Sequence, residues 1–196
     1  MPRMALSQIT WQDVQQLPDD GHRHEAIEGE LHVTPAPTPR HQDIVLRLAI
    51  RLRESLVEPG LGRLWVAPIG VEFPDTGEGV QPDIVFVSAA RRDRIVEAGI
   101  RGAPDLVVEV LSPTTASRDR GVKRKLYERQ GVSEYWIVDP EAEAVEVWTF
   151  GAAGERGAAG EPRATVSHQR FTDRVPVGLA GAPVGEIDLA GVFRAD

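Results

Sequence analysis

The chain has 196 residues and a formal net charge of −8, with 41% hydrophobic and 27% charged residues. This length is typical of one domain, so we expect residues 1–196 to form a single domain. The chain contains no cysteine, which excludes disulfides and thiolate metal sites. Any metal would therefore have oxygen or histidine ligands, which favours Mg²⁺ or Mn²⁺. No apolar run approaches the ~20 residues that span a bilayer, so we expect a cytoplasmic protein without a membrane partner.

The first part of the chain predicts a short helix, a strand pair and a long helix. Thr10 and Asp13 have the spacing of a capping box, which opens a helix. Residues 24–34 favour two short strands with Gly29 in the turn between them. The apolar residues of segment 39–57 recur every four positions, which indicates one face of a helix.

The middle of the chain predicts two strands. Residues 63–73 alternate loosely between apolar and polar and favour one strand, followed by a turn over 74–79. Residues 80–87 form a second apolar run, with Asp83 near its start. The charged segment 89–99 is interpreted as a short helix or loop.

The last part predicts a strand–helix–strand unit and closing strands. Residues 105–111 have the composition of a buried strand, and residues 115–130 that of a helix ended by Gly131. Two more strands are expected at 134–139 and 144–150, and further strands and turns over 166–193, after a loop at 151–161. The order of elements gives an α/β (α+β) fold with a mixed β-sheet flanked by helices.

Two carboxylates are candidates for a metal site. Glu109 lies inside an apolar run, where a charged group is costly unless it is paired or binds a metal. Asp105 shares its strand face but lies about 13 Å away along the strand, too far for a common ion. Asp83 begins the preceding apolar strand, and neighbouring strands lie ~4.8 Å apart, so Asp83 is the better partner.

The helix over 115–130 carries basic residues in an acidic protein. Lys123 and Tyr127 are four residues apart and share the face that returns over Glu109. Lys123 is therefore a candidate catalytic cation. Arg120, Arg124 and Arg129 are expected on the outer side, where they would be free for phosphate contacts.

The sequence resembles the Uma-two family of endonucleases within the PD-(D/E)XK nuclease superfamily. The resemblance spans most of the chain and depends on these residues: Glu25 to Leu31, His41, Gln81-Pro82-Asp83, Asp105 to Pro113, Asp119, Lys123, Tyr127 and Gly131 to Pro140. It implies a restriction endonuclease-like core and hydrolysis of phosphodiester bonds in DNA.

The resemblance also implies roles for individual residues. Asp83 and Glu109, with the Val110 carbonyl, would hold Mg²⁺ or Mn²⁺, and an additional acid would fall on Glu30, which we prefer, or on Glu25. His41 and Tyr127 are secondary candidates. The superfamily's lysine two positions after the glutamate is replaced by Leu111, so Lys123 would take its place. A homodimer is also implied, since two sites would cut two strands.

A second interpretation belongs to another functional class. The missing lysine and the acidic net charge are compatible with an inactive nuclease fold that serves as a nucleic-acid-binding or dimeric interaction module. A small-molecule phosphohydrolase is disfavoured because the chain has no glycine-rich phosphate loop. Metal binding and nicking of DNA separate these alternatives.

Overall fold

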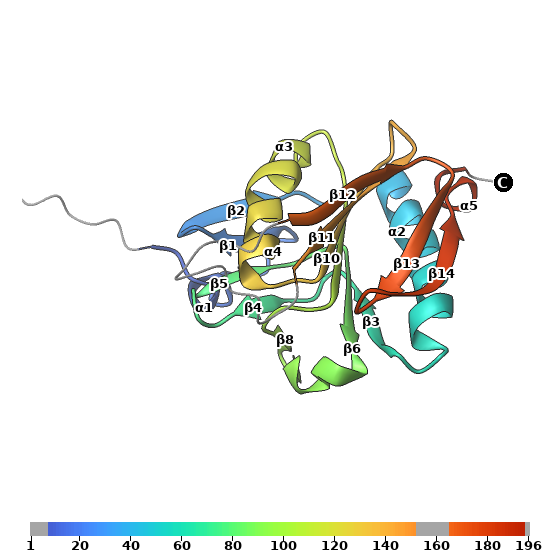
Figure 1. Ribbon diagram of the computed structural model, residues 1–196. Helices are drawn as coiled ribbons and strands as arrows, with labels where there is room; N and C mark the ends of the chain where they lie inside the picture. Colours follow the sequence, from blue (N-terminus) through green and yellow to red (C-terminus); the bar gives the residue numbers. More distant parts are fainter. Residues whose placement is uncertain (1–7, 152–164, 195–196) are drawn as a thin grey trace, which may run out of the picture.

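The computed structural model describes residues 8–151 and 165–194 (Figure 1). The first half contains these elements: α1 (Trp11–Val14), β1 (Arg23–Ile27), β2 (Glu30–Thr34), α2 (Pro39–Leu52), η1 (Arg53–Val57), β3 (Gly62–Val66), β4 (Val71–Phe73), β5 (Glu78–Val80), β6 (Ile84–Ser88), η2 (Ala89–Arg94), β7 (Ile95–Val96) and β8 (Gly99–Arg101). The second half contains these: β9 (Leu106–Val110), α3 (Ala116–Arg118), η3 (Asp119–Lys123), α4 (Arg124–Gln130), β10 (Glu134–Asp139), β11 (Ala144–Phe150), β12 (Thr165–Phe171), β13 (Arg174–Leu179), β14 (Ala182–Asp188) and α5 (Ala190–Phe193).

The strands form three sheets. The central sheet has the order β12-β11-β10-β9-β6-β3, with β9 and β10 parallel and the other pairs antiparallel. A second sheet has the order β2-β1-β5-β4-β8-β7, and β13 and β14 form a two-stranded sheet. The expected mixed sheet with flanking helices is therefore confirmed, although its strands are divided among more than one sheet.

Alternate residues of the central strands face two different hydrophobic layers. Val108 and Val110 of β9 pack with α2, the β13–β14 hairpin and α5, whereas Val107 and Leu111 pack with α4 and the second sheet. Figure 1 shows α4 and α2 on opposite sides of the central strands. Glu109 shares the side of Val107 and Leu111, because successive side chains of a strand alternate. The carboxylate thus faces α4 rather than α2.

Several local predictions are confirmed. Thr10 and Asp13 form the expected capping box, with Thr10 N–H 2.8 Å from Asp13 Oδ2. The β1–β2 hairpin turns through Glu28 and Gly29, which both have positive φ. Two consecutive left-handed residues suit the twist of a tight hairpin. Gly131, in the left-handed conformation, ends the helix over 116–130.

The predicted strand over 63–73 is wrong as a single element. Its first half is β3 of the central sheet and its last three residues are β4 of the second sheet, because the chain passes between the sheets at 67–70, where Pro68 lacks a ladder donor. The run over 80–87 is divided in the same way. Its first residue ends β5, Pro82 interrupts the pairing, and Asp83 lies just before β6.

The remaining predictions are confirmed in part. Segment 89–99 forms a 3₁₀ turn, and also the short strand β7. The end of the chain forms β12, the β13–β14 hairpin and a final short helix. Most of the predicted loop over 151–161 lies outside the described residues. Within the described ranges, no helix is long and apolar enough to cross a membrane.

Candidate active site

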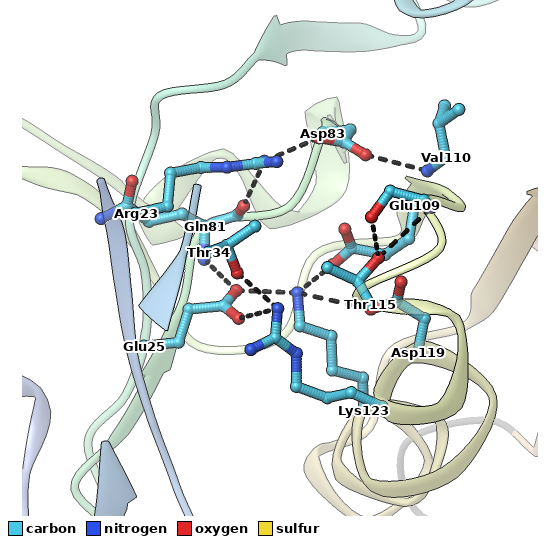
Figure 2. Close-up of polar contacts among 12 residues, drawn as sticks. Arg23, Glu25, Thr34, Gln81, Asp83, Glu109, Val110, Thr115, Asp119 and Lys123 are labelled. Atoms are coloured by element: carbon cyan, nitrogen blue, oxygen red, sulfur yellow. Dashed lines mark hydrogen bonds and ion pairs between the residues drawn. The ribbon is translucent and has the colours of Figure 1, made fainter. Parts of the chain in front are cut away.

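The predicted residues meet at a cavity of about 540 Å³. The cavity is lined from four directions, by β1, by the start of α2, by the ends of β6 and β9, and by the helix over 116–130. Its charged wall consists of Arg23, Glu25, Asp83, Glu109, Asp119 and Lys123, with His41 beside them. Figure 2 shows the carboxylates of Glu25, Glu109 and Asp119 around Lys123, and that of Asp83 between Arg23 and Val110.

Asp83 and Glu109 occupy facing positions of neighbouring strands. The antiparallel register of β6 and β9 pairs Ile84 with Val108, so one step further places Asp83 opposite Glu109. Directly opposed residues point to the same face of a sheet. The two acids therefore lie on the same face of neighbouring strands, and both line the cavity.

The Asp83 carboxylate is surrounded by hydrogen-bond donors. Arg23 Nη1 lies 2.6 Å from Oδ1, and the Val110 N–H donates to Oδ2 at 2.8 Å. His41 Nε2 lies 3.1 Å from Oδ2 and also 3.1 Å from the Val110 carbonyl oxygen. Burial alone would raise the pKa of Asp83, but the hydrogen bond from His41 and the positive charge of Arg23 lower it to about 2.

The Glu109 carboxylate faces the opposite wall of the site. Lys123 Nζ and the Tyr127 hydroxyl each donate to Glu109 Oε1 at 2.8 Å. Burial raises the pKa of Glu109 to about 8, because Lys123 offsets it only in part while Asp83 and Asp119 add like charge. The predicted proximity of Lys123 and Tyr127 to Glu109 is confirmed.

Lys123 is enclosed by three carboxylates. Besides Glu109, its Nζ contacts Glu25 Oε1 at 2.8 Å and Asp119 Oδ1 at 3.9 Å. Burial opposes its charge, but the three acids outweigh burial and raise the pKa of Lys123. The lysine is therefore an ammonium at any physiological pH. It can donate hydrogen bonds and supply charge, but it cannot accept a proton.

Asp119 lies in the site at the start of a local irregularity of the helix. Residues Asp119–Lys123 form a π-helical turn between α3 and α4. Such insertions recur at functional sites because they turn a side chain away from its regular helical direction. Asp119 is 2% exposed, and its Oδ1 is buried without a hydrogen bond. Asp119 is thus a buried acid of the cavity wall beside Lys123.

Glu25, rather than Glu30, lies in the site. Glu25 is 1% exposed and pairs with His32 in the hairpin, whereas Glu30 is exposed beside the turn, opposite Ile27. Both residues lie on one face, but two register steps separate them and only the inner one reaches Lys123. The preference for Glu30 as the additional acid is thus corrected to Glu25.

The three arginines expected on a free basic face are engaged by acids. Arg120 bridges Asp139 and Glu146 at 2.8 and 2.9 Å. Arg124 pairs with Glu128 at 3.0 Å and lies over the Trp148 ring. Arg129 pairs with Glu78 and Glu28. Of the three, Arg120 alone lines the cavity.

Two arginines that line the cavity, Arg23 and Arg118, were not predicted as site residues from the sequence. Arg23 binds Asp83, a residue sixty positions away, and no local pattern indicates this contact. Arg118 donates to Thr34 Oγ1 and lies 4.0 Å from Glu25 Oε2. A recognisable signal existed only for Asp119, since Asp119, Lys123 and Tyr127 are each four residues apart on one helix face.

No group of three or more His, Asp or Glu side chains within residues 8–151 and 165–194 is already arranged as a complete metal cage. The nearest arrangement consists of two side chains and a carbonyl: His41, Asp83 and Val110. The Oε1 of Glu109 is held by Lys123 and Tyr127 on the other wall.

The chain is similar to a solved structure and to a relative of known sequence. A crystal structure described as "a putative nuclease belonging to DUF820" from Anabaena variabilis is similar, with a TM-score of 0.69 at 20% identity over 94% of this chain and 97% of that one. This likeness confirms the expected nuclease-like fold. An uncharacterized protein of Synechocystis sp. is 27% identical over 141 residues, which are 71% of this chain and 70% of the relative.

The Uma2 family, described as "Putative restriction endonuclease", matches residues 11–172. This match includes every residue of the cavity's charged wall. As the resemblance implied, the chain belongs to the Uma2 family.

Proposed function

We propose that the protein hydrolyses phosphodiester bonds of DNA with the help of Mg²⁺ or Mn²⁺. One observation carries the proposal: two buried carboxylates at opposed strand positions, Asp83 and Glu109, share a cavity with a buried ammonium group, Lys123. Buried charges of this kind are costly to keep and cluster at functional sites. The nuclease family of the chain supports the reaction type.

The donor atoms fit a small divalent cation. His41 Nε2 lies 3.1 Å from both Asp83 Oδ2 and the Val110 carbonyl oxygen. Adjacent ligands of an octahedral ion are √2 times farther apart than the bond length, which is about 3 Å for bonds of about 2.1 Å. Asp83, the Val110 carbonyl and Glu109 would hold the ion, with His41 as a further ligand.

A bound divalent cation would supply a Lewis acid that offsets charge on the phosphate and makes water more acidic. The protein residues supply the remainder of the mechanism. Asp83 is ionised at neutral pH because its pKa is about 2, so it is ready to bind a cation without losing a proton. Glu109 must lose its proton first, since its pKa is raised to about 8.

Lys123 takes the place of the lysine that is absent at position 111. Its permanent charge suits it to orient a water molecule by hydrogen bonding and to stabilise negative charge that develops on the phosphate. Glu25 and Asp119 hold the ammonium in place. The Tyr127 hydroxyl restrains Glu109 from the same side.

Access to DNA would come through the cavity rather than the outer face of the helix. Arg124 and Arg129 are engaged by acids and lie outside the cavity lining, so we do not assign them phosphate contacts. Arg120 lines the cavity but is held by Asp139 and Glu146, so we do not assign it a phosphate contact either. Cutting both strands of a duplex would suit a homodimer with two copies of the site, which sedimentation would reveal.

The test is cleavage of supercoiled plasmid with Mg²⁺ or Mn²⁺ by the wild type and by Glu109→Gln. We expect nicking by the wild type that EDTA abolishes, and a loss of about a thousandfold in the variant, as for other groups that stabilise transition-state charge. Glu141→Gln is the matched control, because Glu141 lies at the same cavity but is 84% exposed. Activity of Glu109→Gln equal to that of the wild type would contradict the proposal. Plasmid binding without cleavage would favour the inactive-module alternative.

A further inference from the structure

Arg23 is the cation that neutralises Asp83. It is the first residue of β1, and its Nη1 contacts Asp83 Oδ1 at 2.6 Å and the Gln81 carbonyl at 3.3 Å. The arginine side chain is 19% exposed and the aspartate side chain 4%. Asp83 is therefore buried, whereas part of the Arg23 side chain is exposed to solvent.

The open side of Arg23 carries unused hydrogen-bond donors. Both of its hydrogen bonds to described residues come from Nη1, and neither Nε nor Nη2 is among the fully buried atoms without a partner. These two nitrogens are thus accessible to solvent. A guanidinium presents its donors in a flat fork that matches two oxygens of a phosphate.

The position of Arg23 is also distinctive. It lines the 540 Å³ cavity and a neighbouring cavity of about 720 Å³, and Asp83 and the segment 35–37 form the rest of the shared wall. The second cavity is lined largely by apolar residues, including Val45, Leu46 and Val66. Arg23 can therefore be reached from either side of Asp83.

Arg23 and a divalent cation compete for the same negative charge. Arg23 contacts one carboxylate oxygen of Asp83, and His41 and the Val110 N–H contact the other. A cation placed between Asp83 and Glu109 would therefore lie close to the Arg23 guanidinium. Like charges repel strongly where water is excluded. Binding of the ion thus weakens the hold of Asp83 on Arg23.

We propose that Arg23 is the phosphate-binding residue of this site, and that its guanidinium exchanges Asp83 for a phosphodiester group of the substrate when a divalent cation neutralises Asp83. The inference rests on the proposed function and adds to it a substrate-binding group and an order of events. Two other cations at the cavity, Lys123 and Arg120, are less suited to this role. Lys123 is enclosed by acids, and Arg120 is held by two carboxylates.

The proposal predicts opposite effects of one substitution, Arg23→Gln. Mn²⁺ affinity, measured by calorimetry without DNA, should rise several-fold because a competing positive charge is removed. DNA cleavage should fall at least a hundredfold at saturating Mn²⁺, and DNA affinity measured with Ca²⁺ in place of Mn²⁺ should fall as well. Arg40→Gln is the matched control, since Arg40 lies at the same cavity and pairs with the exposed Glu141. The Mn²⁺ affinity and the DNA cleavage of Arg40→Gln should match those of the wild type.

Each other outcome has a definite meaning. If Arg23 only holds Asp83 in position, Arg23→Gln will bind Mn²⁺ more weakly, and the proposal is overturned. Unchanged cleavage by this variant would overturn it too, while the proposed function would stand. Arg23→Lys keeps the charge without the fork, so it should bind Mn²⁺ as the wild type does and cleave poorly; full cleavage would contradict a role in phosphate binding. A wild type that binds no divalent ion would defeat both the proposed function and this inference.

Discussion

Asp83 and Glu109 lie opposite each other in the same cavity, yet their surroundings shift their pKa values in opposite directions. Asp83 receives hydrogen bonds from Arg23, His41 and a backbone N–H, and its pKa falls to about 2. Glu109 is buried among other acids, and its pKa rises to about 8 despite Lys123. Paired acids whose environments separate their pKa values commonly have different roles. Here the surroundings favour the charged form of Asp83 and the protonated form of Glu109.

The largest change in the free energy of unfolding is expected from Lys123→Met. The substitution removes the ammonium from Glu25, Glu109 and Asp119 and leaves their carboxylates buried together. Breaking a buried ion pair by deleting one partner costs about 3–5 kcal/mol, so the free energy of unfolding should fall by about that amount. Urea denaturation at pH 7 measures it.

The control is Lys125→Met, since Lys125 is on the same helix but exposed. Its effect should stay within about 0.5 kcal/mol. If the two lysine variants lose the same free energy of unfolding, the ion pairs of Lys123 do not stabilise the fold. The charge of Lys123 would then not balance the acids around Glu109.

The next prediction compares the stability of variants in which Asp83 or Glu109 is replaced by its amide. Asp83→Asn should lower the free energy of unfolding at pH 7 by about 2–3 kcal/mol, because a shift of about two pKa units corresponds to about 2.6 kcal/mol. Glu109→Gln should instead raise it, because at pH 7 the unfolded carboxyl is ionised while the buried one keeps its proton at a free-energy cost that an uncharged amide does not have. Denaturation of both variants over pH 2–8 gives the comparison.

The sign of the pH dependence differs for the two acids. The pKa of Asp83 is lower in the folded state than in the unfolded chain, so its stabilisation is present above about pH 4 and is lost as the pH falls through 2. The pKa of Glu109 is higher in the folded state, so its contribution is greatest below about pH 4 and is lost as the pH rises through 8. Equal pH profiles for the two variants would refute the contrast.

The smallest effect is expected from Arg120→Gln, at the edge of the cavity. Arg120 is 40% exposed and bridges Asp139 and Glu146. Exposed ion pairs contribute about 0–1 kcal/mol, and DNA affinity should change less than twofold because the guanidinium is already engaged. Denaturation and fluorescence anisotropy measure the two quantities. A large loss of DNA affinity would support the original prediction that the arginines of this helix contact phosphate groups.

The sequence predicted what depends on local pattern. The helix over 39–57, the hairpin over 24–34 and the strand around Glu109 all follow from periodicity and turn residues over short distances. The pairing of Asp83 with Glu109 followed from adjacent strands, and Lys123 with Tyr127 from helix spacing. These features need little knowledge of the tertiary structure.

The sequence could not predict what depends on long-range contacts or small irregularities. The Arg23–Asp83 pair joins residues sixty positions apart, and the choice of Glu25 over Glu30 depends on which end of the hairpin enters the site. The π-helical turn over Asp119–Lys123 has no sequence pattern of its own. Strands of two or three residues, such as β5 and β8, are too short for a periodic signal.

Calorimetric titration with Mn²⁺ between pH 6 and 9 tests the central claim, which is that two acids of opposite character share one divalent cation. The affinity of the wild type should rise with pH until about 8, with proton release in the lower range, because Glu109 must ionise to bind the ion. Asp83→Asn should abolish binding, and Glu109→Gln should weaken it and remove the pH dependence. Affinity that does not depend on pH, or that survives both substitutions, would contradict the account.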